Sequence, residues 1–339
     1  MRAVALDFEK RRLRECEIGE PRVERADEVL FRVVEVGVCG TDRDLAGFRL
    51  GFPPEGEARL VIGHEALGQV VETGRAVHGF QPGSWVVPRI RRACSGPCPS
   101  CAAGRKDLCI TGSTRERGLF GIHGYFCTYA VDAVEDLTAV PPELVEVAVL
   151  AEPLSVVEKA IERALRIRQA PVERALVLGA GPVGLLAGLT LQIRGAKVAL
   201  HSLEPRDHSR ARLADSAGIE YLESVSEWEG KADVVIEATG SAGAAFQAIA
   251  CLGPLGVCAI VGAPLGQGNV NFSRMIVHNQ VVFGSVNASP QAFETAVADL
   301  ARMDARVLNG LIRRVGFSDF ESSVLGIPPE APKLVHVIE

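Results

Sequence analysis

One stretch of the chain, residues 37–65, gathers side chains that bind transition metals. Cys39, Thr41, His64 and Glu65 offer a thiolate, a hydroxyl, an imidazole and a carboxylate, and nearby glycines allow tight turns. Zinc takes such a mixed set of ligands, and a catalytic zinc keeps one tetrahedral position for water or substrate. Each of these residues alone would suit a structural role. In combination they predict a catalytic metal site.

A second metal motif follows, with four cysteines in one short loop. These are Cys94, Cys98, Cys101 and Cys109, and glycine and proline between them allow tight folding. Four thiolates at this spacing match a closed tetrathiolate zinc site. Because such a site has no open coordination position, this zinc would hold a lobe together rather than take part in chemistry.

Two further segments carry polar residues that suit an active site. Glu152 stands in the apolar run Leu-Ala-Glu-Pro-Leu-Ser. A buried glutamate needs a partner, and a metal ion is one such partner. The segment 114–125 is polar, aromatic and punctuated by glycine, which suits either a substrate-facing loop or an ordinary surface loop.

A nucleotide-binding motif begins after residue 174. An apolar strand runs directly into Gly-Ala-Gly-Pro-Val-Gly at 179–184, and a helical stretch rich in leucine and alanine follows. In this pattern Gly179 permits the turn, Gly181 lets the backbone approach a pyrophosphate, and Gly184 lets the helix pack on the strand. The helix N-terminus favours the negative charge of the phosphates.

The end of the next strand bears on the choice of cofactor. A carboxylate there binds the ribose 2′-hydroxyl of NAD, whereas a neutral residue with a nearby arginine admits the 2′-phosphate of NADP. The position is Ser202, with Glu204, Arg206 and Arg210 beyond it. Both cofactors therefore stay open.

The pattern of strands and helices predicts an α/β protein of two domains, the first of them mostly β. Short strands with glycine and proline turns at 30–36, 67–72 and 83–88 indicate a mostly-β, barrel-like first domain. Beyond residue 174, strands alternate with helices, which is typical of a doubly wound parallel sheet. We expect the boundaries 1–153 for the catalytic domain, 154–289 for the nucleotide domain and 290–339 for a segment that returns to the first.

Composition excludes several other classes of protein. The 339 residues are 47% hydrophobic and carry a formal net charge of −6, which argues against a nucleic-acid partner. No apolar run reaches the length of a membrane-spanning helix, and the N-terminus lacks the features of a signal peptide. Nine cysteines without a secretion signal are therefore not read as a disulfide framework, and we expect a cytoplasmic protein.

Over nearly its whole length the chain resembles the zinc-containing medium-chain dehydrogenases/reductases. The resemblance rests on Gly-His-Glu-Ala-Leu-Gly at 63–68, on Cys39 before it and on the four-cysteine loop after it. Within that family the chain is most similar to the glucose dehydrogenases of archaeal and bacterial type. The segments that carry this narrower resemblance are 39–42, 116–118, 123–124, 152–154, 158–159 and 284–287.

The resemblance implies a GroES-like catalytic domain, a Rossmann nucleotide domain and a zinc bound by Cys39, His64 and either Glu65 or Glu152. It implies oxidation of an aldose at C1 to the lactone, with hydride transfer to NAD or NADP and Thr41 as a proton relay. Sugar contacts would come from Thr41, Glu116, Glu152 and Asn287. Cofactor contacts would come from Gly179, Gly181, Pro182, Val183, Gly184, Ser202, Glu204, Arg206, Thr239, Gly240, Val286 and Asn287. Related enzymes also imply a homodimer or homotetramer.

Three alternatives remain beside this hypothesis. A polyol dehydrogenase of the sorbitol type shares the Glu-Pro-Leu-Ser run at 152–155, although the segment 116–124 fits the glucose enzymes better. A catalytically silent nucleotide-binding protein would keep only the structural zinc. A nucleic-acid-binding zinc module is disfavoured because the cysteine loop lacks clustered aromatic and basic partners.

Overall fold

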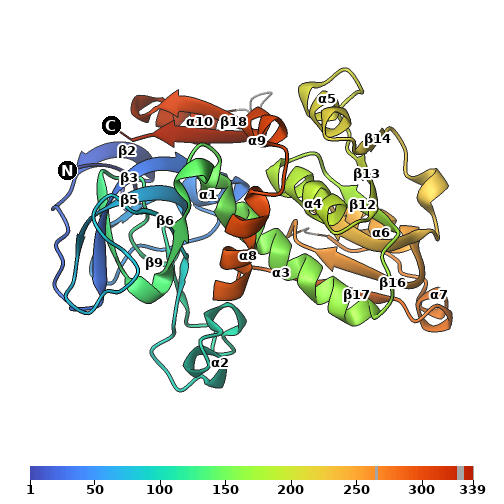
Figure 1. The fold of residues 1–339 in the computed structure, drawn as a ribbon, viewed down its shortest axis with the longest axis horizontal. Helices are drawn as coiled ribbons and strands as arrows, with labels where there is room; N and C mark the ends of the chain where they lie inside the picture. Colours follow the sequence, from blue (N-terminus) through green and yellow to red (C-terminus); the bar gives the residue numbers. More distant parts are fainter. Residues whose placement is uncertain (264–265, 327–331, 339) are drawn as a thin grey trace.

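The computed structural model describes residues 1–263, 266–326 and 332–338. Two sheet-based domains lie side by side, with the N-terminal domain at the left of Figure 1 and the nucleotide domain at the right. Helices α3 (Ala151–Arg168) and α8 (Pro290–Leu300) lie between them. The expected α/β fold, a GroES-like β domain with a Rossmann domain, is confirmed.

The first domain is built from three sheets. The largest has seven strands, in the order β11-β6-β5-β3-β19-β18 with β10 paired to β3. Its strands are β3 (Glu28–Gly37), β5 (Glu65–Thr73), β6 (Trp85–Pro88), β10 (Tyr129–Ala133), β11 (Leu137–Val140), β18 (Ile312–Gly316) and β19 (Lys333–Val337). The two small sheets contain β1 (Arg2–Asp7), β2 (Arg12–Glu17) and β4 (Arg59–Val61), and β7 (Arg91–Arg92), β8 (Arg115–Arg117) and β9 (Gly121–Ile122).

Alternating side chains determine how the central strand β3 packs. Val29, Phe31 and Val33 are fully buried, whereas the residues between them are half-buried. Successive side chains of a strand point to opposite faces, so this alternation aims one face into the core. The same strand pairs with β5 on one side and with the C-terminal strand β19 on the other, so residues near both ends of the chain meet beside residue 37.

The nucleotide domain contains one parallel sheet in the order β14-β13-β12-β15-β16-β17. Strand β12 is buried along Ala175–Leu178, as expected for a parallel strand covered on both faces by helices. The strands are β12 (Arg174–Leu178), β13 (Lys197–His201), β14 (Glu220–Leu222), β15 (Ala232–Glu237), β16 (Leu252–Ile260) and β17 (Val281–Gly284). Besides α3 and α8, the helices of the first domain are α1 (Gly40–Ala46), α2 (Pro99–Ala102) and α10 (Phe320–Leu325). Those from residue 182 to 311 are α4 (Pro182–Ile193), α5 (Ser209–Ser216), α6 (Ala242–Cys251), α7 (Phe272–Val277) and α9 (Ala305–Leu311).

The predicted domain boundaries stay predictions. The range 290–339 includes residues 327–331 and 339, which lie outside the described part of the chain, as do 264–265 of the nucleotide range. Within the described residues, no helix has the length and apolar character needed to cross a membrane.

An ionic cluster joins helices α3, α4 and α8. Glu158 of α3 accepts hydrogen bonds from Arg194, at 2.5 Å, and from Thr190 of α4, and Arg194 also binds Asp299 of α8. Burial raises the pKa of Glu158 to about 7, and nearby Asp299 adds to the rise, while Arg194 opposes it. The native protein therefore binds a proton at Glu158 over a pH range in which the unfolded chain has released it.

This cluster predicts a pH dependence of folding stability. The folded pKa of Glu158 lies above its ordinary value of 4.5, so its favourable contribution is complete below about pH 4.5 and is lost as the pH rises through about 7. We expect Glu158→Gln to flatten the fall in unfolding free energy across that range, by roughly 3 kcal/mol. Urea denaturation at a series of pH values measures the slope, with Glu162→Gln, whose side chain is half exposed, as the matched control.

Candidate active site

Backbone pairing brings the two halves of the first metal motif together. Strand β3 ends at Gly37 and leads to Cys39, which precedes the first turn of α1, while Glu65 opens β5. Gly37 and Glu65 are partners in the β3–β5 ladder, and a Cβ on Gly37 would lie 2.2 Å from a Glu65 carboxylate oxygen. Glycine at 37 therefore leaves room for the Glu65 side chain beside Cys39.

His64 is oriented by a neighbouring carboxylate. Its Nδ1 lies 3.1 Å from Asp42 Oδ1, and the other Asp42 oxygen accepts a 2.8 Å hydrogen bond from the Cys39 amide. This contact leaves Nε2 as the nitrogen available to a metal, the arrangement in which a carboxylate fixes a histidine ligand. Burial opposes a charged imidazole, but Asp42 outweighs it and raises the pKa of His64 well above its ordinary value.

Glu65 has a buried cationic partner that sequence patterns did not reveal. Lys333 of β19 places Nζ at 2.7 and 2.6 Å from the two Glu65 carboxylate oxygens and at 3.2 Å from the Val38 carbonyl oxygen. The side chains of Lys333 and Glu65 are 3% and 1% exposed, so the two charges meet away from water. Burial opposes the charge on Lys333, but Glu65 outweighs it and raises the pKa of the lysine.

Glu152 lies in the first turn of α3 with its side chain buried. Burial raises its pKa to about 8, and the nearby Glu65 carboxylate adds to the rise. A carboxylate in such surroundings gains most from a neighbouring cation. The structure thus brings both candidate third ligands, Glu65 and Glu152, to the same buried region.

The donor set fits a zinc ion. Cys39 Sγ, an imidazole nitrogen of His64 and a carboxylate oxygen of Glu65 all lie within 4.8 Å of one another. Three protein ligands of these types are what a catalytic zinc needs, with a fourth position for water or substrate. The Thr41 hydroxyl lies 3.7 Å from Cys39 Sγ, at the edge of this cluster.

The four-cysteine loop also closes as a metal site would require. The sulfur atoms of Cys94, Cys98, Cys101 and Cys109 lie within 4.8 Å of one another, with 3.8 Å between the first and third and 4.0 Å between the second and fourth. Amide groups of Ile110 and Cys101 lower the pKa of Cys98 to about 6, which favours the thiolate that zinc binds. The loop forms a lobe around α2, at the bottom of Figure 1.

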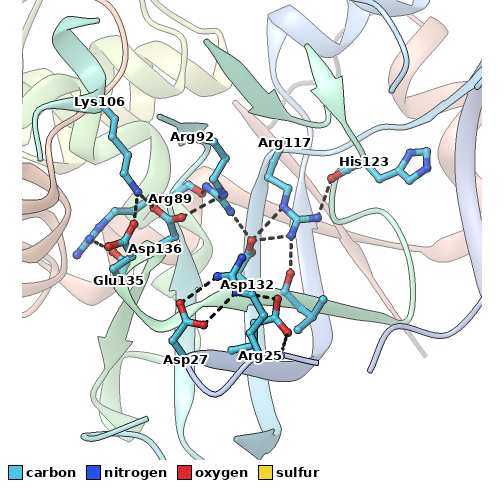
Figure 2. A network of polar contacts seen from close by, with 12 residues as sticks. Arg25, Asp27, Arg89, Arg92, Lys106, Arg117, His123, Asp132, Glu135 and Asp136 are labelled. Carbon is cyan, nitrogen blue, oxygen red and sulfur yellow. Dashed lines mark hydrogen bonds and ion pairs between the residues drawn. The ribbon is translucent and has the colours of Figure 1, made fainter. Parts of the chain in front are cut away.

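The segment 114–125 packs against the backbone at Gly63, beside the metal cluster. A Cβ on Gly118 or Gly124 would lie 2.5 or 2.3 Å from the carbonyl oxygen of Gly63, the residue before His64. The segment is held from the other side by Arg117, which donates to the carboxylate of Asp132 and to two backbone carbonyls (Figure 2). It is therefore a fixed wall beside His64 rather than an ordinary surface loop.

Glu116 and Asn287 meet across the two domains. Asn287 Nδ2 donates to Glu116 Oε1 at 3.2 Å, and the Arg91 guanidinium binds the same oxygen at 2.7 and 2.8 Å. Asn287 adopts a left-handed backbone conformation with φ of 60°, which asparagine tolerates better than most residues. His123 does not take part in this contact. Its Nδ1 accepts a hydrogen bond from the Val61 amide.

The glycine motif has the local geometry that its spacing predicts. Gly179 has φ of 107°, a Cβ on Gly184 would lie 1.8 Å from the Gly179 carbonyl oxygen, and a Cβ on Gly181 would meet nothing within 4 Å. The open face at Gly181 borders a cavity of about 730 Å³ at the carboxyl end of the sheet. Residues that line this cavity include Gly179, Gly181, Ser202, Glu204, Arg210 and Thr239.

The polar residues at one end of this cavity are paired with one another. Glu204 accepts hydrogen bonds from the Ser202 hydroxyl and from Arg210, the latter at 2.7 Å. Burial opposes the charge on Glu204, but these donors outweigh it and lower its pKa, so the carboxylate is ionised. Arg206 binds the Tyr221 carbonyl oxygen and Asp215 instead.

The remaining predicted cofactor residues lie at three places. Pro182 and Val183 begin α4 directly after the glycine turn, and Gly240 follows Thr239 after β15. Val286 and Asn287 follow β17, and Asn287 borders a second cavity of about 230 Å³.

A metal-binding β domain joined to a Rossmann domain defines a zinc-containing medium-chain dehydrogenase. Family models agree: the Alcohol dehydrogenase GroES-like domain matches residues 25–142, and the Glucose dehydrogenase C-terminus matches residues 145–324. The chain belongs to the glucose dehydrogenase family of these enzymes.

Individual relatives match along almost the whole chain. A glucose 1-dehydrogenase of Methanocella arvoryzae is 38% identical, over 99% of this chain and 99% of its own. One of Thermoproteus tenax is 39% identical, over 89% and 88%. Among solved structures, the glucose dehydrogenase of Haloferax mediterranei in complex with NADP, Zn and gluconolactone has a TM-score of 0.91 at 29% identity, covering 100% of this chain and 99% of that one.

Proposed function

We propose that Cys39, His64 and a carboxylate of Glu65 or Glu152 hold the zinc with which this enzyme oxidises an aldose, D-glucose first, at C1 to the lactone. The hydride passes to NAD or NADP. The observation that carries the proposal is the cluster of Cys39, His64 and Glu65 ligand atoms within 4.8 Å, on a chain 38% identical to a glucose 1-dehydrogenase. Zinc bound there supplies Lewis-acid chemistry, which lowers the pKa of a hydroxyl group that it contacts.

The side chains around the cluster have distinct tasks in this reaction. Thr41 passes on the proton that the C1 hydroxyl releases, since its own hydroxyl lies beside Cys39. Asp42 keeps the His64 ring in one orientation, and Lys333 balances the charge of Glu65.

Glu116 and Asn287 orient the sugar, with Thr41 and Glu152 as further contacts. The donors from Arg91 and Asn287 all converge on Glu116 Oε1. No donor from the described part of the chain bonds to Oε2, which leaves that oxygen to accept a sugar hydroxyl. A site built to hydrogen-bond hydroxyls discriminates substrates far better than apolar walls do.

The glycine turn at 179–184 holds the pyrophosphate of the cofactor, with Pro182 and Val183 behind it. Ser202, Glu204 and Arg206 lie toward the adenosine end, and Thr239, Gly240, Val286 and Asn287 toward the nicotinamide end. The open face at Gly181 and the cavity beside it support this assignment.

Initial rates of NADH and NADPH formation, with D-glucose, other aldoses and sorbitol, test the reaction. We expect turnover with glucose that a zinc chelator abolishes. Activity confined to sorbitol or other alcohols would replace the sugar assignment with the polyol dehydrogenase. Silence across the panel, together with zinc in the four-cysteine lobe alone, would favour the non-catalytic alternative.

The charge on Glu204 is expected to affect the preference between NAD and NADP. Its ionised carboxylate, at the adenosine end of the cavity, binds a ribose diol and repels a 2′-phosphate. Glu204→Gln removes that charge and releases Arg210, so we expect the ratio of kcat/KM for NADP over NAD to rise about tenfold, or about 1.4 kcal/mol. Glu220→Gln, an exposed change on the neighbouring strand β14, is the control, and an unchanged ratio in Glu204→Gln would refute the role.

Assembly, location and domain boundaries complete the proposal. The enzyme is a homodimer or homotetramer of the cytoplasm, with the domain boundaries 1–153, 154–289 and 290–339. The homo-oligomer is supported by strand β17, which lies at the edge of the parallel sheet, because an edge strand can pair with the same strand of a second copy. Size-exclusion chromatography with light scattering measures the assembly.

A further inference from the structure

Three charged side chains, Asp107, Lys159 and Arg91, link the four-cysteine lobe to the proposed sugar contacts. Asp107 lies in a short 3₁₀ turn (Lys106–Leu108) two residues before Cys109. Its carboxylate binds Lys159 of α3 at 2.8 Å, and Lys159 donates to the carbonyl oxygen of Val286 at 2.9 Å. This carbonyl belongs to the peptide bond that leads into Asn287.

The contacts then return to the lobe by a second route. Asn287 donates to Glu116, and Glu116 binds Arg91. Arg91 in turn donates to the backbone carbonyl oxygen of Asp107 at 3.3 Å. Asp107, Lys159, Asn287, Glu116 and Arg91 therefore form a closed ring of contacts that joins the lobe, the β7–β8 strands and the nucleotide domain.

The charged side chains of the ring are mostly buried, whereas Asn287 is half-buried. The Asp107 side chain is fully buried, and those of Glu116, Lys159 and Arg91 are 7%, 10% and 16% exposed. Charge-assisted hydrogen bonds in such surroundings are less screened than at the surface. A chain of direct contacts thus runs from Asp107 through Lys159 to the Val286 carbonyl, next to Asn287, whose backbone is in the left-handed region.

Asp107 is itself positioned by the lobe. It lies between Cys101 and Cys109, so closing the four-cysteine site fixes the turn that carries it. Arg105 of the same turn holds the Asp107 carboxylate with two 3.0 Å hydrogen bonds.

We propose that Asp107 and Lys159 are positioning residues through which the four-cysteine lobe sets the geometry of Asn287 and Glu116, and with it the affinity for the sugar. The proposal rests on the function proposed above. It gives the lobe a task in substrate binding although its cysteines leave no site for substrate.

Kinetics of Lys159 variants test the proposal. Lys159→Met removes both hydrogen bonds, so we expect KM for glucose to rise about tenfold while kcat falls less than about threefold, because a displaced positioning group weakens substrate binding first. The dissociation constant of NADH, from fluorescence quenching, should rise less than KM for glucose, because Val286 and Asn287 lie only at the nicotinamide end and the glycine turn at 179–184 is untouched. Lys159→Arg should recover part of the loss. Lys106→Met is the matched control, because that lysine binds Glu135 and Asp136 outside the ring (Figure 2).

A second readout needs no activity. Hydrogen exchange at residues 284–289 should accelerate in Lys159→Met and in the lobe variant Cys101→Ser, and the double variant should add little to either, because both break one linkage. Asp107→Asn replaces Lys159→Met if the latter does not fold. An unchanged KM and unchanged exchange, or an equal loss of sugar and NADH binding, would overturn the proposal. A wild-type enzyme that is inactive on glucose would reject the proposed function, while the exchange result would still decide the linkage.

Discussion

Cys39→Ala is expected to lower kcat/KM for glucose by about 10³-fold or more. Removing the thiolate that we propose as a zinc ligand forfeits Lewis-acid stabilisation of several kcal/mol, and each 1.36 kcal/mol is a factor of ten in rate. Cys39 is only half-buried and lies at the start of α1, so folding and NADH binding should change little. Zinc content should fall by about half, since the four-cysteine site is untouched.

Three measurements check this expectation: steady-state rates, metal analysis and NADH fluorescence titration. Cys16→Ala is the matched control, because Cys16 is also a half-buried free thiol but belongs to β2, outside both candidate metal clusters. A Cys39→Ala enzyme with normal turnover would show that the zinc assignment is wrong.

Lys333→Met is expected to cost about 3–5 kcal/mol of unfolding free energy, since removing one partner of a buried ion pair leaves the other charge uncompensated. Glu65 would keep a carboxylate that is 1% exposed, with Glu152 as a further nearby acid. The loss should be largest in chelated protein, because a zinc ion offers Glu65 another positive charge.

A double substitution separates charge from packing. Lys333→Met combined with Glu65→Gln should recover most of the loss, because no uncompensated charge then remains. Urea denaturation with and without zinc measures all three variants. Lys10→Met, at an exposed position, should stay within about 0.5 kcal/mol of the wild type. A Lys333→Met protein as stable as the wild type would mean that the pair contributes nothing.

The sequence determined those features whose geometry depends on neighbouring residues. The glycine turn at 179–184 is one: its backbone conformation and close approaches follow from the lack of Cβ atoms within six residues. The four-cysteine loop is another, since its thiols lie within one short segment that folds back on itself. The run at 30–36 predicted a strand for the same local reason, and β3 spans Glu28–Gly37.

The metal cluster was predictable only in part. Cys39 and His64 stand in recognisable local motifs, but the ladder between β3 and β5 brings them together. The sequence left open whether the segment with Glu116 faces the substrate or is an ordinary surface loop. Its close packing against Gly63 decides this, and no residue spacing in the sequence indicates that packing.

Only the tertiary structure decided which charged and polar side chains meet. Lys333 binds Glu65 across 268 residues, and Asn287 binds Glu116 across 171. Nothing in the sequence around Lys333 marks it as different from a surface lysine, because its burial comes from the pairing of β19 with β3. Burial removes the water that would screen these charges, so partners chosen by the fold, rather than by sequence neighbours, set the electrostatics of the site.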